Sequence, residues 1–151
     1  MPFNIRTARP ADTTVIADFN RRLAEETESK VLDPATVLAG VTALIDDAAH
    51  GQYYVADAGG DVIGQLLITY EWSDWRNGQF WWIQSVYVSP AHRRRGIFKA
   101  LFDHVSALAR ANPMVCGIRL YVDEHNAQAL ATYGALGFSS PGYRVLEVEL
   151  G

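Results

Sequence analysis

Residues 84–101 read QSVYVSPAHRRRGIFKAL, and this stretch decides the fold more than any other part of the chain. An apolar strand ends at Pro90, three arginines and Gly96 follow, and Ile97, Leu101, Val105 and Leu108 then recur at helical spacing. The pattern predicts a strand, a basic turn and the start of a helix. The first N–H groups of a helix lack carbonyl partners, so such a turn favours phosphate binding. A solvated basic turn without a ligand is the alternative.

The composition is that of an acidic globular protein whose positive charge is concentrated in that turn. The chain has 151 residues, a net charge of −4 and 49% hydrophobic residues. Single domains run to about 100–200 residues, so we expect one domain over residues 1–151. The acidic balance argues against nucleic-acid binding, which requires a basic surface.

Targeting and metal signals are weak in this sequence. Apolar runs of about 18 residues, which a transmembrane helix needs, do not occur, and the N-terminal residues lack the apolar core of a signal peptide. We therefore expect no membrane association. The single cysteine, Cys116, favours a reducing, cytoplasmic location, and we expect it to be a buried, unreactive thiol. The four histidines show no metal-ligand spacing, so no metal is expected.

The periodicity predicts a mixed α/β (α+β) fold, with antiparallel strands followed by β-α-β crossovers. Expected strands cover residues 3–9, 53–57, 62–72, 80–88, 116–122 and 143–150. Expected helices cover residues 10–28, 33–51, 96–111 and 126–137.

Three blocks of the chain resemble the GNAT superfamily of acyl-CoA-dependent N-acetyltransferases. Residues 93–98 match the family's Arg/Gln-x-x-Gly-x-Gly/Ala turn, except that Phe98 stands in the last position. Residues 120–138 are similar to its strand, Asn-headed helix and Tyr-x-x-x-Gly-Phe ending, and residues 6–12 to its first strand and turn. The resemblance implies a mostly antiparallel central sheet, splayed between its fourth and fifth strands and flanked by about four helices.

The resemblance also implies acetyl-CoA as the cofactor and places its parts on this chain. The pyrophosphate is expected at the basic turn, where Gly96 would let the backbone approach the ligand. The pantetheine arm is expected to pair with the fourth strand, which in the family carries a bulge, here near Val86, whose freed N–H can bond the thioester oxygen. The expected contacts are Val86, Tyr87, Val88, Arg93, Arg94, Arg95, Gly96, Ile97, Phe98 and Lys99.

Two residues of the last predicted helix complete the expected cofactor site. Asn126 and Tyr133 are two helical turns apart, so they point to the same side. By resemblance, Tyr133 donates a proton to the CoA sulfur and Asn126 bonds the pantetheine arm. The alternatives are a core aromatic for Tyr133 and a plain helix cap for Asn126.

The base that accepts the proton of the amine is less obvious. Gln84 occupies the position where many family members have a glutamate, and glutamine cannot be a base. Glu71 is our candidate, and the alternative is a solvated strand-end carboxylate. A relay through water and backbone carbonyls, or an acceptor amine that is already acidic, are further alternatives.

Gln84 and several other residues are candidates for contact with the acceptor. Glu25, Glu26 and Asp74 could form a negative mouth that attracts cationic amines. Trp72 belongs to an aromatic group that usually packs in a core but could form a wall facing the substrate.

The sequence therefore predicts an N-acetyltransferase that moves acetyl directly from acetyl-CoA to a primary amine of a small molecule or peptide. The alternative is a non-catalytic acyl-CoA-binding or sensor module, which Gln84 and Phe98 would suit. Homodimers are common in the family, so a homodimer is also an expectation here.

Overall fold

The computed structural model describes residues 2–151, which divide into two compact units. The first unit ends at Leu120 and contains the whole sheet, and the second runs from Tyr121 to Gly151. The single domain expected from the length of the chain stays a prediction.

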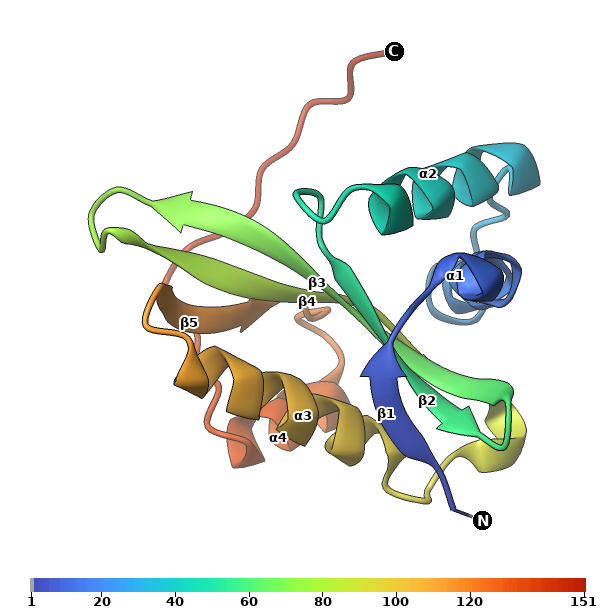
Figure 1. Ribbon diagram of the computed structural model, residues 1–151. Coiled ribbons are helices and arrows are strands. Elements are labelled where there is room, and N and C mark those ends of the chain that lie inside the picture. The colour runs from blue at the N-terminus through green and yellow to red at the C-terminus, as the bar shows by residue number, and fades with distance from the viewer. Residues whose placement is uncertain (1) are drawn as a thin grey trace. The chain divides into compact units, whose positions relative to one another are not determined.

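A five-stranded sheet in the order β1-β2-β3-β4-β5 forms the centre of the first unit (Figure 1). Its strands are β1 (Asn4–Thr7), β2 (Gln52–Ala58), β3 (Asp61–Ser73), β4 (Gly78–Val88) and β5 (Val115–Leu120). Neighbouring strands pair antiparallel except β4 and β5, which are parallel. The mixed, mostly antiparallel sheet is confirmed.

The sheet opens between β4 and β5. The register joins residues 79–83 of β4 to residues 115–120 of β5 and ends at the pair Ile83 and Leu120. The remainder of β4, residues 84–88, pairs with β3 alone among the described strands. The predicted splay between the fourth and fifth strands is therefore confirmed, and it leaves one edge of β4 open.

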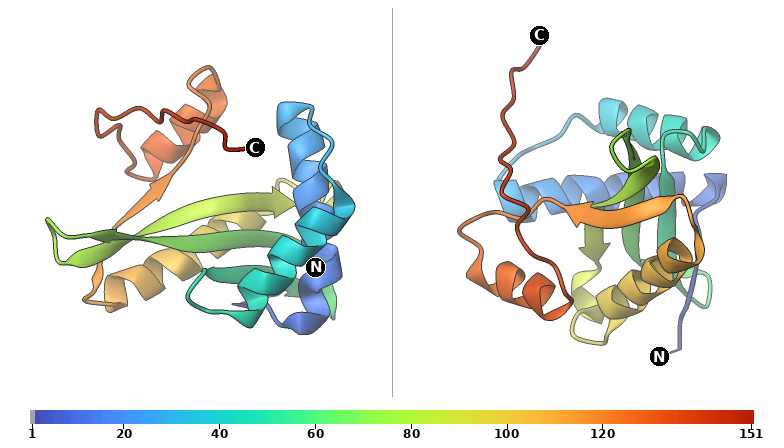
Figure 2. Two further views of the ribbon diagram at one scale, coloured as in Figure 1. Left: turned by 90° about the horizontal axis from the view of Figure 1, so that it is seen from above. Right: turned by 90° about the vertical axis from the view of Figure 1, so that its left-hand side faces the viewer.

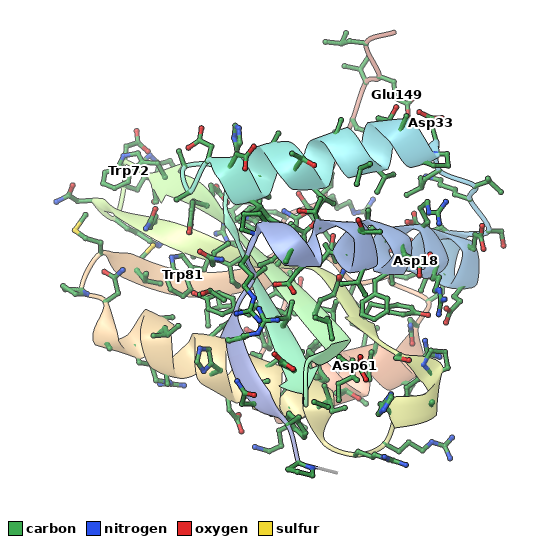
Figure 3. All side chains as sticks on the ribbon, turned by 45° about the vertical axis from the view of Figure 1, so that its right-hand side comes forward. Asp18, Asp33, Asp61, Trp72, Trp81 and Glu149 are labelled. Atoms are coloured by element: carbon green, nitrogen blue, oxygen red, sulfur yellow. The ribbon has the colours of Figure 1, made fainter. Side chains whose placement is uncertain are left out.

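Helices cover both faces of this sheet. The helices are α1 (Thr13–Glu28), α2 (Pro34–Asp46), α3 (Ile97–Ala111) and α4 (Ala127–Ala135), with 3-10 turns at Pro10–Asp12 and Pro90–His92. In the first unit α1 and α2 lie on one face and α3 on the other (Figures 1 and 2). Asp33, at the start of α2 in Figure 3, caps that helix by accepting a hydrogen bond from the Thr36 N–H at 3.0 Å.

Two apolar contacts fix the helices beside the open part of β4. On one face Ile16 of α1 and Val41 of α2 pack on Tyr53, Val55 and Leu67. On the other face α3 approaches so closely that a Cβ on Gly64 would lie 2.9 Å from Ile97 Cγ2. A side chain at position 64 would push the start of α3 away, so Gly64 sets where that helix begins relative to the sheet.

Two predicted elements differ from the structure. The second helix ends at Asp46 and not near Gly51, because Asp47 bonds its own local turn through Oδ1 to the Ala49 N–H at 3.0 Å. The predicted strand over residues 143–150 is wrong: these residues belong to no helix or strand. A strand needs a partner for its backbone groups, and the second unit contains no other strand.

The described residues hold no helix that is both long enough and apolar enough to span a membrane.

Candidate active site

The open part of β4 begins with a β-bulge. Gln84 pairs with Leu67 and Tyr87 with Gln65, so Ser85 and Val86 together face the single residue Leu66. Ser85 has a φ of 50°, in the left-handed region that a serine adopts only when its surroundings hold it there. The bulge predicted near Val86 is confirmed, and it takes a residue out of the regular ladder at the edge that β5 leaves open.

A buried chain of polar side chains holds the bulge in place. Gln65 is fully buried and donates from Nε2 to the Ser85 carbonyl at 2.9 Å and to Asn20 Oδ1 at 2.7 Å. Asn20 in turn donates from Nδ2 to the Tyr53 hydroxyl at 3.0 Å. Burial raises the pKa of Tyr53, so its phenol stays protonated at neutral pH. Sequence reasoning missed this network, although a glutamine within the apolar run VIGQLLI was a usable signal.

A cavity of about 400 Å³ reaches the bulge from the side of α1 and α2. This volume lies within the range of pockets for small molecules, about 300–1,000 Å³. Asn20, Tyr53 and Ser85 supply polar atoms to its lining, and most of its other lining residues are aliphatic. The remaining lining residues are Leu23, Ala24, Glu28, Lys30, Leu32, Val37, Gly40 and Val41.

The basic turn that follows β4 fits an anionic ligand. Arg94 and Gly96 both have left-handed backbones, with φ of 65° and 76°. Gly96, the N-cap of α3, has no side chain that could cap the helix, and the first N–H groups of a helix have no carbonyl acceptor within it. A Cβ on Gly96 would meet nothing within 4 Å, so its φ, not crowding, requires glycine, and the space before the turn is open. Exposed Arg94 and Arg95 could add charge-assisted bonds there.

The guanidinium of Arg93, in the same turn, is already hydrogen-bonded within the protein. Its Nε donates to the Val88 carbonyl at 2.9 Å, and its NH2 donates to Glu26 Oε1 at 2.7 Å. The Tyr87 hydroxyl donates to the other oxygen of Glu26. Hydrogen bonds from Tyr87 and from Arg93 lower the pKa of Glu26. Glu26 and Arg93 thus join the end of α1 to the basic turn, a link that sequence reasoning had not predicted.

Glu25, next to Glu26 on α1, is exposed. Three predicted cofactor contacts lie in the first turn of α3. There Ile97 is buried and anchors the start of the helix, and Phe98 packs on Phe102. The Lys99 ammonium lies 2.6 Å from Asp103 Oδ2.

Glu71, the predicted base, lies away from the bulge. It faces Phe80 on β4, which places it roughly 16 Å along the strand from Ser85 at about 3.3 Å per residue. Its Oε1 accepts hydrogen bonds from Trp82 Nε1 at 2.8 Å and from Arg119 at 3.1 Å. Its role as base stays a prediction, and the geometry favours a structural role in joining β3, β4 and β5.

The other residues predicted to contact the substrate amine lie at different distances from the bulge. Gln84 lies next to the bulge and donates to Thr69 Oγ1 at 2.6 Å. Trp72 is 57% exposed and faces Gln79, farther from the bulge than Glu71, and Asp74 follows in the exposed turn (Figure 3). The structure therefore brings Gln84, but not Trp72 or Asp74, to the bulge.

In the second unit α4 carries the two remaining candidates. Asn126 caps this helix by accepting from the Ala129 N–H at 3.0 Å, as its alternative reading expects. Tyr133 packs edge-on against Phe138 with ring centroids 5.7 Å apart, and burial raises the pKa of its phenol. A phenol that keeps its proton at neutral pH has the form that a general acid needs. The contacts of Asn126 and Tyr133 with a cofactor stay predictions.

Cys116 is exposed, contrary to the expected burial. It lies on β5 between the residues that pair with Gln79 and Phe80, so its side chain belongs to the part of the sheet remote from the bulge. No three His, Cys, Asp or Glu side chains of the described chain form a group that could hold a metal ion.

Comparison with known proteins agrees with this geometry. The model of the acetyltransferase (GNAT) family matches residues 17–138. The crystal structure of a possible acetyltransferase from Clostridium difficile 630 is 44% identical, with a TM-score of 0.94 over 99% of both chains. A thialysine N-epsilon-acetyltransferase of Caenorhabditis elegans is 28% identical over 138 residues, covering 90% of this chain and 82% of that protein.

The structure of a ribosomal-protein-alanine N-acetyltransferase from Brucella melitensis biovar Abortus 2308 has 16% identity and a TM-score of 0.77, covering 99% of this chain and 100% of that one, a likeness of fold alone. Since the family model spans most of the sequence, this chain belongs to the GNAT family of acetyltransferases, which catalyse N-acetylation.

Proposed function

We propose that this enzyme uses acetyl-CoA as donor and transfers the acetyl group directly to a primary amine of a small molecule or peptide. The observation that carries this proposal is the open edge of β4 beyond Ile83, which has a bulge at Ser85 and Val86 and the N-terminus of α3 beside it. The pantetheine arm carries amides that can pair with such an edge as an added strand would.

Two groups of residues would hold the cofactor, and a third residue would support one of them. Backbone groups of residues 86–88 would pair with the pantetheine arm. Arg94, Arg95 and the first N–H groups of α3 would bind the pyrophosphate, because helix N-termini and guanidinium groups both favour anions. Arg93 would act indirectly, by fixing the turn to Glu26 and Val88.

Bound acetyl-CoA supplies an activated acyl group, and the chain supplies orientation and proton transfers. A backbone N–H at the bulge would stabilise negative charge on the carbonyl oxygen as the amine attacks. The new C–N bond forms as the C–S bond breaks. Tyr133 would give its proton to the sulfur, and the proton lost by the amine would pass to water, since Gln84 cannot accept it.

The most direct test measures free CoA released from acetyl-CoA in the presence of a panel of primary amines. We expect release that depends on both the amine and the enzyme. The alternative, a non-catalytic sensor, predicts that acetyl-CoA binds in calorimetry but that no amine in the panel releases CoA. Absence of both binding and release would contradict the two hypotheses together.

The predicted homodimer is a separate proposal. Light scattering after size exclusion should give a mass of about twice the 16.7 kDa of one chain. A mass of one chain at micromolar concentration would contradict it.

A further inference from the structure

We infer that the cavity beside the bulge binds an amino acid with a terminal side-chain amine, and that Glu28 and Lys30 recognise its α-ammonium and α-carboxylate. This inference rests on the proposed function, because it places the reacting amine at the bulge. It adds the substrate class and the residues that select it.

Asn20 and Glu28 both line the cavity and lie eight residues apart on α1, about 12 Å along the helix, so the polar groups of the lining fall into two separate regions. Ser85, Tyr53 and Asn20 lie at the bulge, and Leu23, Leu32, Val37 and Val41 form apolar lining. Glu28 and Lys30 also line the cavity, at the end of α1. A ligand that matches this distribution has a polar group at each end and an aliphatic chain between them.

Glu28 and Lys30 lie together because of the way α1 ends. Ser29 adopts a left-handed backbone with a φ of 52°, and the Lys30 N–H returns to the Ala24 carbonyl at 3.1 Å. The Lys30 ammonium then lies 3.7 Å from Glu28 Oε1. Both side chains are about two-thirds exposed, so this pair contributes little to stability and can exchange partners at small cost.

A zwitterion fits such a pair by exchange of partners. The α-ammonium of an amino acid would replace Lys30 at Glu28, and the α-carboxylate would replace Glu28 at Lys30. Each protein charge keeps an opposite partner, whereas a ligand with one charge leaves one protein charge without one. The pair therefore favours a headgroup that carries both charges over an amine that carries only one.

The opposite end of the cavity suits the reacting amine. The Ser85 carbonyl is fixed by Gln65, and the Tyr53 hydroxyl is fixed by Asn20. Hydroxyl and amide oxygens can accept hydrogen bonds from an amine and hold it beside the bulge, where the thioester is proposed to lie. The similar C. elegans protein is named for acetylation of the ε-nitrogen of thialysine, which has a zwitterionic headgroup and a terminal amine.

Four acceptors with matched chains test the inference. L-Lysine has both headgroup charges, cadaverine lacks the carboxylate, ε-aminocaproate lacks the α-amine, and pentylamine lacks both. We expect kcat/KM to be highest for lysine and to fall about tenfold for each missing charge, the size of one hydrogen bond to a charged group. Equal kcat/KM for all four acceptors would overturn the inference.

Two variants assign each charge to its residue. Glu28→Gln should lower kcat/KM about tenfold for lysine and cadaverine and leave ε-aminocaproate and pentylamine unchanged. Lys30→Met should lower it for lysine and ε-aminocaproate and leave the other two unchanged. Asp18→Asn, on α1 but outside the cavity lining, and Arg110→Gln, at the end of α3, are matched charge controls. A uniform effect on all four acceptors would contradict headgroup recognition.

Acetylation assays and calorimetry together separate this inference from the proposed function. If pentylamine is acetylated but lysine has no advantage, the inference fails and the function stands. If no amine is acetylated, the function fails, and binding of lysine to the CoA-saturated protein still tests the site. Lysine binding that weakens about tenfold in Glu28→Gln and Lys30→Met supports the headgroup site, and absence of lysine binding overturns it.

Discussion

The two halves of β4 belong to one strand but have different surroundings. Residues 79–83 pair with β3 on one side and β5 on the other. There Arg119 lies 3.6 Å from the Phe80 ring centroid, and Glu71 bonds both Trp82 and Arg119. Residues 84–88 pair only with β3 among the described strands, and they carry the bulge and the contacts to Gln65, Glu26 and Arg93.

The difference shows how one strand can serve two purposes. A fully paired strand uses all its backbone groups within the sheet and makes a rigid support. A strand that loses one neighbour offers those groups to a ligand, provided that side chains fix its shape. Here Gln65 fixes the bulge by donating a hydrogen bond to the Ser85 carbonyl, and the ion pair between Glu26 and Arg93 fixes the turn that follows.

The largest expected effect tests whether the open half works with the phenol of α4. Tyr133→Phe should lower kcat by about 10²–10⁴-fold, the usual size of general-acid catalysis, with little change in CoA affinity. Steady-state kinetics and calorimetry measure the two quantities separately. Unchanged kcat would remove the proposed role of Tyr133.

Neutralising the basic turn should affect binding more than chemistry. Arg94→Gln and Arg95→Gln should each weaken CoA binding by about 10–100-fold, as expected for loss of a charge-assisted bond. Arg110→Gln provides the control for net charge. Equal weakening in the control would indicate that general charge, and not this turn, attracts the cofactor.

Gln65→Leu tests whether the side-chain network shapes the open half. It leaves the part-buried Ser85 carbonyl and Asn20 Oδ1 without their donor, which should destabilise the fold by about 1–3 kcal/mol and lower kcat about tenfold. Urea unfolding and kinetics measure both effects. Gln79→Leu in the paired half is the control, with an expected cost below about 0.5 kcal/mol. Equal costs at both positions would contradict the comparison.

The link between α1 and the turn predicts a pH dependence of stability. The folded-state pKa of Glu26 is below its ordinary value, so ionised Glu26 stabilises the fold at neutral pH. That contribution is complete above the ordinary pKa of about 4.5 and is lost as pH falls through the lowered folded value. Thermal unfolding of Glu26→Gln between about pH 3 and 7 should show a shallower loss on acidification than the wild type. Identical slopes would show that this link does not stabilise the fold.

The smallest effect is expected in the paired half. Glu71→Gln removes an ion pair at a half-exposed site and should cost about 0–1 kcal/mol of stability. We expect the acidic limb of the pH–rate profile to stay as in the wild type. Loss of that limb would support the predicted role of Glu71 as the base. It would also contradict the division of β4 into a supporting half and a reactive half.

Local patterns predicted the parts of this site that depend on neighbouring residues. The strand, basic turn and helix over residues 84–101 follow from apolar periodicity, and the position of the bulge followed from the family resemblance. The network of Gln65, Asn20 and Tyr53 could not be predicted in the same way, because its members come from β3, α1 and β2. The partner of Arg93 was hidden for the same reason, since Glu26 lies on a distant helix.

The failed predictions depend on tertiary context. The apolar alternation of residues 143–150 is typical of a strand, but alternation specifies a face and not a partner. The exposure of Cys116 likewise depends on what covers β5, which its own sequence does not encode.

A crystal structure with bound coenzyme A tests the central claim most directly. The account predicts that the pyrophosphate lies at Arg94, Arg95 and the N-terminus of α3, and that the pantetheine arm follows residues 86–88 along the edge of β4 that β5 leaves open. Coenzyme A bound at another surface, with this edge of β4 unused, would contradict it.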